Sequence, residues 1–320
     1  MSSERRPEVE RLVEERTAAR ASRDWARADA LRDALQALGW DVVDGPDGTA
    51  LVPVLAAAEP AQVGYARAED LASLLDQPAS LPSSLVVLAE DHPDDLARFL
   101  SGLADHPPSV EVEVVIVANA PSYDLDAVAG GRPFVPVVLH SSERLGWADA
   151  VNLGLRRARG TAVILLDTSL EPRGDFVAPL LAALGAPGVG VAGGYGVTSA
   201  DMREFSDAPP GPVDAVEGYC LATRREVLRD VGLFDHHFRF YRNADLDFCF
   251  AVRAAGWEAV RTEPLPLERH EHRGYAALPP EERDRLSRRN FYRFLRRWGS
   301  RPELLHAPGP WPPPRRERPG

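Results

Sequence analysis

From residue 84 onward, short apolar runs alternate with stretches of helical periodicity, and this alternation restricts the fold more than any other feature of the chain. The apolar runs are SLVVLA at 84–89, VEVVIVA at 112–118, VPVVLH at 135–140, AVILLD at 162–167 and VGVAGG at 189–194. The helical stretches lie at 93–103, 147–157 and 176–184. Strands that alternate with helices in this way predict an α/β domain whose mostly parallel sheet has helices on both faces.

Polar residues end or follow three of the predicted strands, namely Glu90, Asn119 and Asp167. Because ligands bind beyond the carboxyl ends of the strands in such sheets, we expect these residues at a ligand site. Asp167 could hold a divalent cation that neutralises a diphosphate, or it could cap the turn that follows its strand. A good cation site needs two or three oxygen ligands, and the residue two positions along is Ser169 rather than an acid.

The chain is predicted to contain two folded parts, a linker and a tail. Residues 1–57 hold two helices and a β-hairpin around a Gly-Pro-Asp-Gly turn. Residues 58–83 carry several prolines and little periodicity, which indicates a linker. Residues 84–300 form the α/β domain, and residues 301–320, with seven prolines, are predicted to be a disordered tail.

Charge and cysteine content exclude several classes of protein. The 37 basic and 48 acidic residues leave a net charge of −11, so nucleic acid is not an expected partner. Two cysteines cannot build a disulfide framework, which fits a reducing compartment. The N-terminal residues lack the apolar segment of a secretory signal, and the chain has no apolar run of about 18 residues. We therefore expect a cytoplasmic protein.

Two acidic residues, Asp245 and Asp247, stand at the start of a predicted helix. They are two positions apart, so on a helix they face different directions and are not expected to share one task. One of them could face a cleft as a general base while the other caps the helix or pairs with an arginine. Alternatively, both are first-turn carboxylates favoured by the helix dipole. Arg225, at the start of an earlier helix, could bind phosphate or form a surface ion pair.

Two further patterns allow a functional and a structural interpretation. His270 and His272 would share a face on a strand and could ligate a metal or hold a pyrophosphate, although solvated histidines are commoner. Residues 281–300 interleave apolar side chains with seven arginines. We expect the apolar stripe of this helix to pack on the domain. The alternative is peripheral contact with the inner face of an anionic membrane.

The segment from Ser84 to about Trp298 resembles the family 2 glycosyltransferases, which have the GT-A fold. The donor-side helix and Asp-x-Asp strand of that family resemble SSERLGWADAVNLGLRRARGTAVILLDTS, and its acceptor-side block resembles VEGYCLATRREVLRDVGLFDHHFRFYRNADLDFCFAVRAAGW. Its C-terminal histidine strand and Arg-Asn helix resemble HEHRG and RRNFYRF. The resemblance implies transfer of a sugar from a nucleotide-sugar donor to an acceptor hydroxyl, usually with inversion. It also implies a divalent cation, Mn²⁺ or Mg²⁺, as a possible cofactor.

The resemblance implies roles for individual residues. Asp167 corresponds to the first acid of the Asp-x-Asp motif, and Asp245 corresponds to the general base. The donor side would further include Glu90, Asn119, Asn152 and Ser169. The acceptor and diphosphate side would include Asp247, Arg225, His270 and His272, with Arg289 as a further diphosphate contact.

Four departures from the family pattern surround the predicted donor site. Ser169 stands where the family has a metal-binding Asp, and Ala118 stands where an Asp often binds the base. Ala89 and Glu90 replace Pro-Thr, and Ala244 replaces the Glu before the general base. Three alternatives follow: an enzyme that needs little or no metal, an unusual donor, or a catalytically impaired module that acts as a binding or scaffold protein.

The N-terminal part carries a second resemblance. The stretch RLVEERTAARASRDWARADALRDALQALGWDVVDGPDGTALV is similar to the C-terminal tail region of cysteinyl-tRNA synthetases. The catalytic domain and zinc-binding cysteines of the synthetases have no counterpart here, so amino-acid activation is not implied. Arg16, Arg20 and Arg23 could contact tRNA and link the protein to RNA. We favour a docking or dimerising module, because the arginines are mixed with acids and form no basic face.

Overall fold

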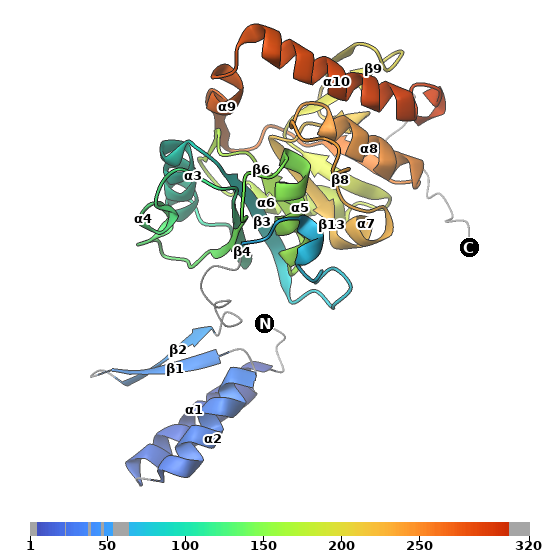
Figure 1. Cartoon of the computed structure of the whole chain (residues 1–320). Helices are drawn as coiled ribbons and strands as arrows, with labels where there is room; N and C mark the ends of the chain where they lie inside the picture. The colour runs from blue at the N-terminus through green and yellow to red at the C-terminus, as the bar shows by residue number, and fades with distance from the viewer. Residues whose placement is uncertain (1–4, 23, 38–39, 46–47, 54–63, 307–320) are drawn as a thin grey trace. The chain divides into compact units, whose positions relative to one another are not determined.

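The computed structural model describes residues 5–22, 24–37, 40–45, 48–53 and 64–306. The chain divides into two compact units, Met1–Gln62 and Val63–Gly320 (Figure 1). The buried apolar residues of the first unit form a core of their own, separate from the two core layers of the second unit.

The first unit is a helical hairpin followed by a β-hairpin, as predicted. Helix α1 (Arg5–Ala21) packs against α2 (Trp25–Ala37), and β1 (Trp40–Gly45) pairs antiparallel with β2 (Gly48–Pro53). The core of this unit contains Val9, Leu12, Leu35 and Val42. Of the arginines considered for tRNA contact, Arg16 is buried and Arg23 lies outside the described residues.

An eight-stranded sheet forms the centre of the second unit. Its spatial order is β11 (Gly211–Val213), β14 (Glu258–Arg261), β8 (Val189–Gly193), β13 (Cys220–Arg224), β6 (Gly160–Leu166), β3 (Leu81–Ala89), β4 (Val112–Ala118) and β5 (Val137–His140). The strands from β6 to β5 are parallel to one another, and β14 is parallel to β8. Strand β13 runs antiparallel between β6 and β8. The predicted mostly parallel sheet is confirmed.

Helices cover both faces of this sheet (Figure 1). One layer contains α3 (Pro93–Asp105), α4 (Leu125–Ala129) and α6 (Val177–Gly185). The other contains α5 (Trp147–Arg157), α7 (Arg225–Asp230), α8 (Ala244–Ala254) and α10 (Pro280–Trp298). Along β3, Leu85 and Val87 face the first layer and Val86 faces the second. Because both faces are buried, the central strands are apolar throughout.

Two small sheets and a short helix complete the second unit. Strand β9 (Gly196–Ser199) pairs with β10 (Phe205–Asp207) and β12 (Ala215–Val216), and β7 (Leu170–Pro172) pairs with β15 (Leu267–Arg269). Helix α9 (Arg273–Ala276) follows β15. The prediction that His270 and His272 share one strand is wrong, because β15 ends at Arg269 and His272 is the N-cap of α9.

The segment assigned to a linker belongs in large part to the second unit. Leu71 and Leu75 are buried in its core, the 3₁₀ turn η1 (Ala68–Asp70) lies just before them, and the Tyr65 N–H donates to the His140 carbonyl at 2.8 Å. Arg156 Nε donates to the Leu71 carbonyl at 2.8 Å. The backbone of this segment is irregular, although hydrogen bonds hold it to the domain. Because it contains no long helix or strand, its sequence shows no periodicity. Residues 58–63 lie outside the described residues.

The C-terminal region packs on the second core layer. The expectation for residues 281–300 is confirmed, because Phe294 and Trp298 of α10 are buried in that layer. The predicted tail starts too early: Leu304, in the turn η2 (Pro302–Leu304), is buried, and its carbonyl accepts from Arg253 Nε at 2.6 Å. Residues 307–320 lie outside the described residues. Within the described parts of the chain, no helix combines the length and apolar character needed to cross a membrane.

Candidate active site

The residues that follow β3, β4 and β6 meet at the carboxyl edge of the sheet. Asn119 is buried; its Nδ2 donates to Glu90 Oε1 at 2.8 Å, and its Oδ1 accepts from the Leu145 N–H at 2.8 Å. Glu90, Asp167 and Ser169 line a cavity of about 70 Å³, the first cavity. Asn119 does not line it and instead holds Glu90 and the segment that leads into α5.

Asp167 and His272 are in direct contact in the wall of the first cavity. Asp167 Oδ1 accepts the Ser169 N–H at 2.8 Å, and Asp167 Oδ2 lies 3.2 Å from His272 Nε2. The Nδ1 of His272 accepts the Tyr275 N–H at 3.1 Å, and the imidazole stacks on the Tyr241 ring at 4.6 Å. Burial raises the pKa of Asp167, but the hydrogen bond and charge of His272 outweigh it, so this pKa lies below its usual value.

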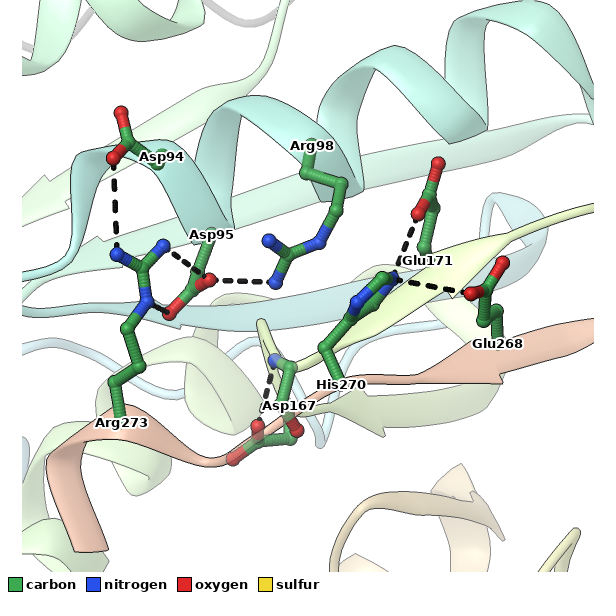
Figure 2. Close-up of polar contacts among 9 residues, drawn as sticks. Asp94, Asp95, Arg98, Asp167, Glu171, Glu268, His270 and Arg273 are labelled. Carbon is green, nitrogen blue, oxygen red and sulfur yellow. Dashed lines mark hydrogen bonds and ion pairs between the residues drawn. The ribbon is translucent and has the colours of Figure 1, made fainter. Parts of the chain in front are cut away.

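A buried ion-pair cluster holds the segment that carries His272. Arg273 donates from Nε and Nη2 to the two carboxylate oxygens of Asp95 at 2.9 and 2.6 Å, and Arg98 donates to the same group at 2.5 Å (Figure 2). Asp95 is only 3% exposed and lies in the first turn of α3. Since Arg273 directly follows His272, this cluster ties the His272 segment to α3.

His270 points to a different group of acids from His272. Its Nε2 lies 2.8 Å from Glu171 Oε2 and 4.0 Å from Glu268 Oε1, on the small sheet of β7 and β15 (Figure 2). Glu171 and Glu268 are directly opposite in that sheet, and Arg173 pairs with both at 3.0 and 2.7 Å. The Arg173 guanidinium and the His270 imidazole thus both contact the two opposed carboxylates. The predicted histidine pair therefore does not meet at one ligand.

Asp245 lies in a second cavity, of about 210 Å³. It stands in the first turn of α8, and its Oδ2 and Oδ1 accept the N–H groups of Gly218 and Leu246, each at 2.9 Å. Burial raises the pKa of Asp245 against these bonds and the charge of Arg242. The other wall residues of the second cavity are Trp147, Asp167, Val197, Phe205, Asp207, Glu217, Gly218, Tyr219, Tyr241, Arg242, Asn243 and Leu246.

Three of the predicted site residues hold elements together instead of lining a cavity. Asp247 is buried and accepts from Arg297 Nη1 at 2.7 Å and Trp298 Nε1 at 2.8 Å. Asn152 exchanges two hydrogen bonds with the main chain of Phe234, at 2.8 and 3.1 Å. Arg225 donates to three main-chain carbonyls, those of Leu74, Leu75 and Ala158. Arg289, on the exposed side of α10, lines neither cavity.

Sequence reasoning missed Glu217 and Arg273. Glu217 lines the second cavity beside Asp245, and Arg273 lines the first beside Asp95. Glu217 directly precedes Gly218, whose N–H binds Asp245, but nothing in the local sequence pattern marks that position. Arg273 belongs to the HEHRG segment, in which the family pattern marks the histidines and not the arginine.

The fold and the two cavities define a GT-A glycosyltransferase domain. Residues 84–250 match the family model described as glycosyl transferase family 2, and the chain belongs to that family. Residues 3–49 match the model described as the cysteinyl-tRNA ligase anticodon binding domain. Both resemblances derived from the sequence are confirmed.

Curated relatives match each part separately. The chain is 27% identical over 238 residues to a pre-mycofactocin glycosyltransferase of Mycobacterium tuberculosis (strain ATCC 25618 / H37Rv), which covers 68% of this chain and 48% of that protein. The chain thus spans about half the length of this relative. Over 42 residues it is 62% identical to a cysteine–tRNA ligase of Anaeromyxobacter dehalogenans (strain 2CP-C), or 13% of this chain and 9% of that protein.

Solved structures share the fold. GalNAc-T7, solved with UDP, GalNAc and Mn²⁺, superposes with a TM-score of 0.57 at 16% identity, covering 75% of this chain and 56% of that chain. The mannosyltransferase PcManGT from Pyrobaculum calidifontis, in complex with GDP-Man and Mn²⁺, gives 0.50 at 19% identity, covering 72% and 74%. At these identities the likeness concerns the fold alone.

Proposed function

We propose that the chain transfers a sugar from a nucleotide-sugar donor to an acceptor hydroxyl with inversion at the anomeric carbon, and that Asp245 is the general base. The observation that carries this proposal is the adjacency of the two cavities, which share the wall residues Trp147, Asp167, Gly218 and Tyr241. A donor diphosphate beside Asp167 and an acceptor beside Asp245 would meet across these four residues.

The first cavity would receive part of the donor diphosphate, since about 70 Å³ is too small for a whole nucleotide sugar. Glu90, Asp167 and Ser169 would contact the nucleotide sugar from the sheet edge. The His272 imidazole and the Arg273 guanidinium also line this cavity and could donate hydrogen bonds to a diphosphate. UDP and GDP-mannose in the two neighbouring structures suggest uridine and guanosine donors as the first to try.

A divalent cation fits the donor side through Asp167. Both neighbouring structures contain Mn²⁺. Asp167 would hold the ion with a carboxylate oxygen, and substrate phosphates and water would supply the other ligands. A bound ion would neutralise charge on the diphosphate. Ser169 adds no carboxylate, so we expect weaker metal dependence than at a site with two acids.

The chemistry of the second cavity follows from the position of Asp245. As the acceptor oxygen bonds to the anomeric carbon, its proton passes to Asp245, and the bond from that carbon to the diphosphate oxygen breaks. Attack on the face opposite the diphosphate inverts the configuration. The raised pKa makes Asp245 a stronger base than an ordinary aspartate.

A catalytically impaired binding or scaffold module is the second candidate function. Ser169 and Ala244 favour it, because both replace acids at positions where the family pattern has them. The first unit would then bind a partner. Its match to an anticodon binding domain suggests RNA as one such partner.

The proposal is tested on the full chain with UDP-, GDP- and dTDP-sugars, each in the presence of Mn²⁺ or EDTA. Thermal shift measures donor binding, and a panel of glycoside acceptors is used to measure transfer. We expect one nucleotide class to raise the melting temperature, because a ligand of the folded state stabilises it. Asp245→Asn should keep that shift while transfer, followed by nucleotide release, falls by about 100-fold or more.

Asp126→Asn, an exposed aspartate on α4, is the matched control and should leave transfer unchanged. Full transfer by Asp245→Asn would remove Asp245 from the role of base. The absence of a thermal shift with every donor would favour the second candidate.

A further inference from the structure

The second cavity contains a carboxylate that the proposed chemistry does not use. Glu217 follows β12 and precedes the turn at Gly218. Its main-chain N–H donates to the Tyr195 carbonyl at 3.0 Å, which fixes the backbone. Among the described residues, its carboxylate has no hydrogen-bond or ion-pair partner. The Glu217 carboxylate is therefore positioned at the cavity wall and available to a ligand.

Negative charge dominates the wall of the second cavity. Four carboxylates line it, against the single guanidinium of Arg242. The four are Asp167, Asp207, Glu217 and Asp245. Arg269 lies nearby but does not line the cavity, and its guanidinium stacks 3.8 Å from the centre of the Tyr219 ring. An acceptor with a phosphate or carboxylate in this cavity would meet mainly like charge.

Burial first, and then the charge of Asp245, raise the pKa of Glu217, and Asp207 acts in the same direction. Arg269 and Arg242 lower this pKa without cancelling the rise.

Aromatic rings form the other walls. Trp147, Phe205, Tyr219 and Tyr241 line the cavity. Ring faces attract both apolar surfaces and cations. The cavity has a volume of about 210 Å³. Cavities that hold drug-sized ligands measure about 300 Å³ or more, so this one is smaller. The cavity thus suits one small ring-shaped portion of an acceptor that has hydrogen-bond donors on its edge.

We propose that Glu217 selects the acceptor by accepting a hydrogen bond from a second hydroxyl or ammonium group beside the reacting hydroxyl. The acceptor class is then a neutral or amino-bearing polyhydroxy compound, and acceptors with an anionic group at that place are rejected. This inference rests on the proposed function, because that function places the acceptor in the second cavity.

The test measures equilibrium binding, so that it does not require turnover. The full chain is saturated with UDP or GDP, whichever nucleotide binds, together with Mn²⁺, which blocks the first cavity. Binding of methyl glucoside, methyl glucosaminide and glucose 6-phosphate is then measured by saturation-transfer NMR. We expect both methyl glycosides to bind, the amino compound more tightly, and glucose 6-phosphate to bind at least about tenfold more weakly. Raising the salt concentration should reduce the preference for the amino compound.

Glu217→Gln keeps the size of the side chain and removes its charge. The Gln amide oxygen still accepts, but a hydrogen bond without the charge is about half as strong, which predicts about tenfold weaker binding of the glycosides. Glu217→Asp, which restores the charge on a shorter stem, should recover part of that loss. Glu111→Gln removes an exposed glutamate outside both cavities and should change nothing. Unchanged nucleotide affinity shows that each variant is folded.

Three results would overturn the inference: glucose 6-phosphate that binds as tightly as the glycosides, glycoside affinity that is unchanged in Glu217→Gln, or no binding of any probe. Sugar transfer is measured on the same samples. Glycosides that bind through Glu217 without transfer from any donor would contradict the proposed function and support the assignment of Glu217.

Discussion

At the scale of single residues, the two acids at the start of α8 have different surroundings although they are two positions apart. Asp245 faces the second cavity, where main-chain N–H groups hold it. Asp247 points the other way, into the contact with α10, where Arg297 and Trp298 donate to it. As the helical spacing predicts, the two side chains face different directions, and Asp247 is the one that pairs with an arginine.

The stability of the second unit should depend on Asp247. Asp247→Ala leaves Trp298 Nε1 without its acceptor and removes the partner of Arg297, so we expect a loss of about 2 kcal/mol in the free energy of unfolding. Urea unfolding measures this loss. Asp284→Ala removes an exposed acid whose ion pair with Arg288 spans 3.7 Å, and it should cost less than about 0.5 kcal/mol.

Donor-induced thermal stabilisation should persist in Asp247→Ala. If Asp247→Ala had normal stability but did not bind the donor, Asp247 would belong to the donor site.

At the scale of elements, the Asp95 cluster joins α3 to the segment that carries His272. Arg98 and Arg273 both donate to this single buried carboxylate, and Arg273 is 178 positions away in the sequence. Burial raises the pKa of Asp95, but the hydrogen bonds and charges of Arg273 and Arg98 together lower it below 3.8.

The contribution of Asp95 to stability should depend on pH in a defined direction. A depressed pKa in the folded protein means that the contribution is complete above the usual pKa of 3.8 and is lost as the pH falls through the lower, folded value. Asp95→Asn should therefore be less stable than the wild type at pH 7 by about 2 kcal/mol, and the difference should shrink in acid.

Chemical unfolding at several pH values measures this difference. Asp94→Asn is the control, since its side chain is 83% exposed and its ion pair with Arg273 spans 3.7 Å. A difference for Asp95→Asn that stays constant from pH 7 to pH 2 would show that charge is not the cause.

At the scale of the whole molecule, the two units have separate cores, and the boundary between them can be tested by truncation. Removal of residues 1–62 should leave the melting temperature and the donor binding of the second unit unchanged, because none of its core residues is lost. Removal of residues 1–80 should destabilise it strongly. The longer truncation takes away Leu71, Leu75 and the carbonyls that Arg156 and Arg225 bind.

Calorimetry of both truncated chains measures the effect. If the two truncated chains were equally stable, the domain would begin near residue 83, as the sequence predicts.

Much of the fold could be predicted because its signals are local. The apolar runs of β3, β4 and β6 and the helical stripes between them are periodic over a few residues, so the α/β class and the strand ends at Glu90, Asn119 and Asp167 follow from the sequence. The helical and β-hairpins of the first unit follow in the same way. The order of the family motifs identified Asp245 as the candidate general base, and this role stays a prediction.

Only the tertiary structure decided which side chains face the cavities. In the structure, Arg225 and Asn152 donate to main-chain carbonyls. His270 and His272 contact different carboxylates. Glu217 lines the same cavity as Asp245. The physical reason is that periodicity depends on neighbours in sequence, whereas the partner of a polar side chain is set by groups that folding brings together from distant positions. The Asp95 and Arg273 pair, 178 residues apart, has no local signature at either end.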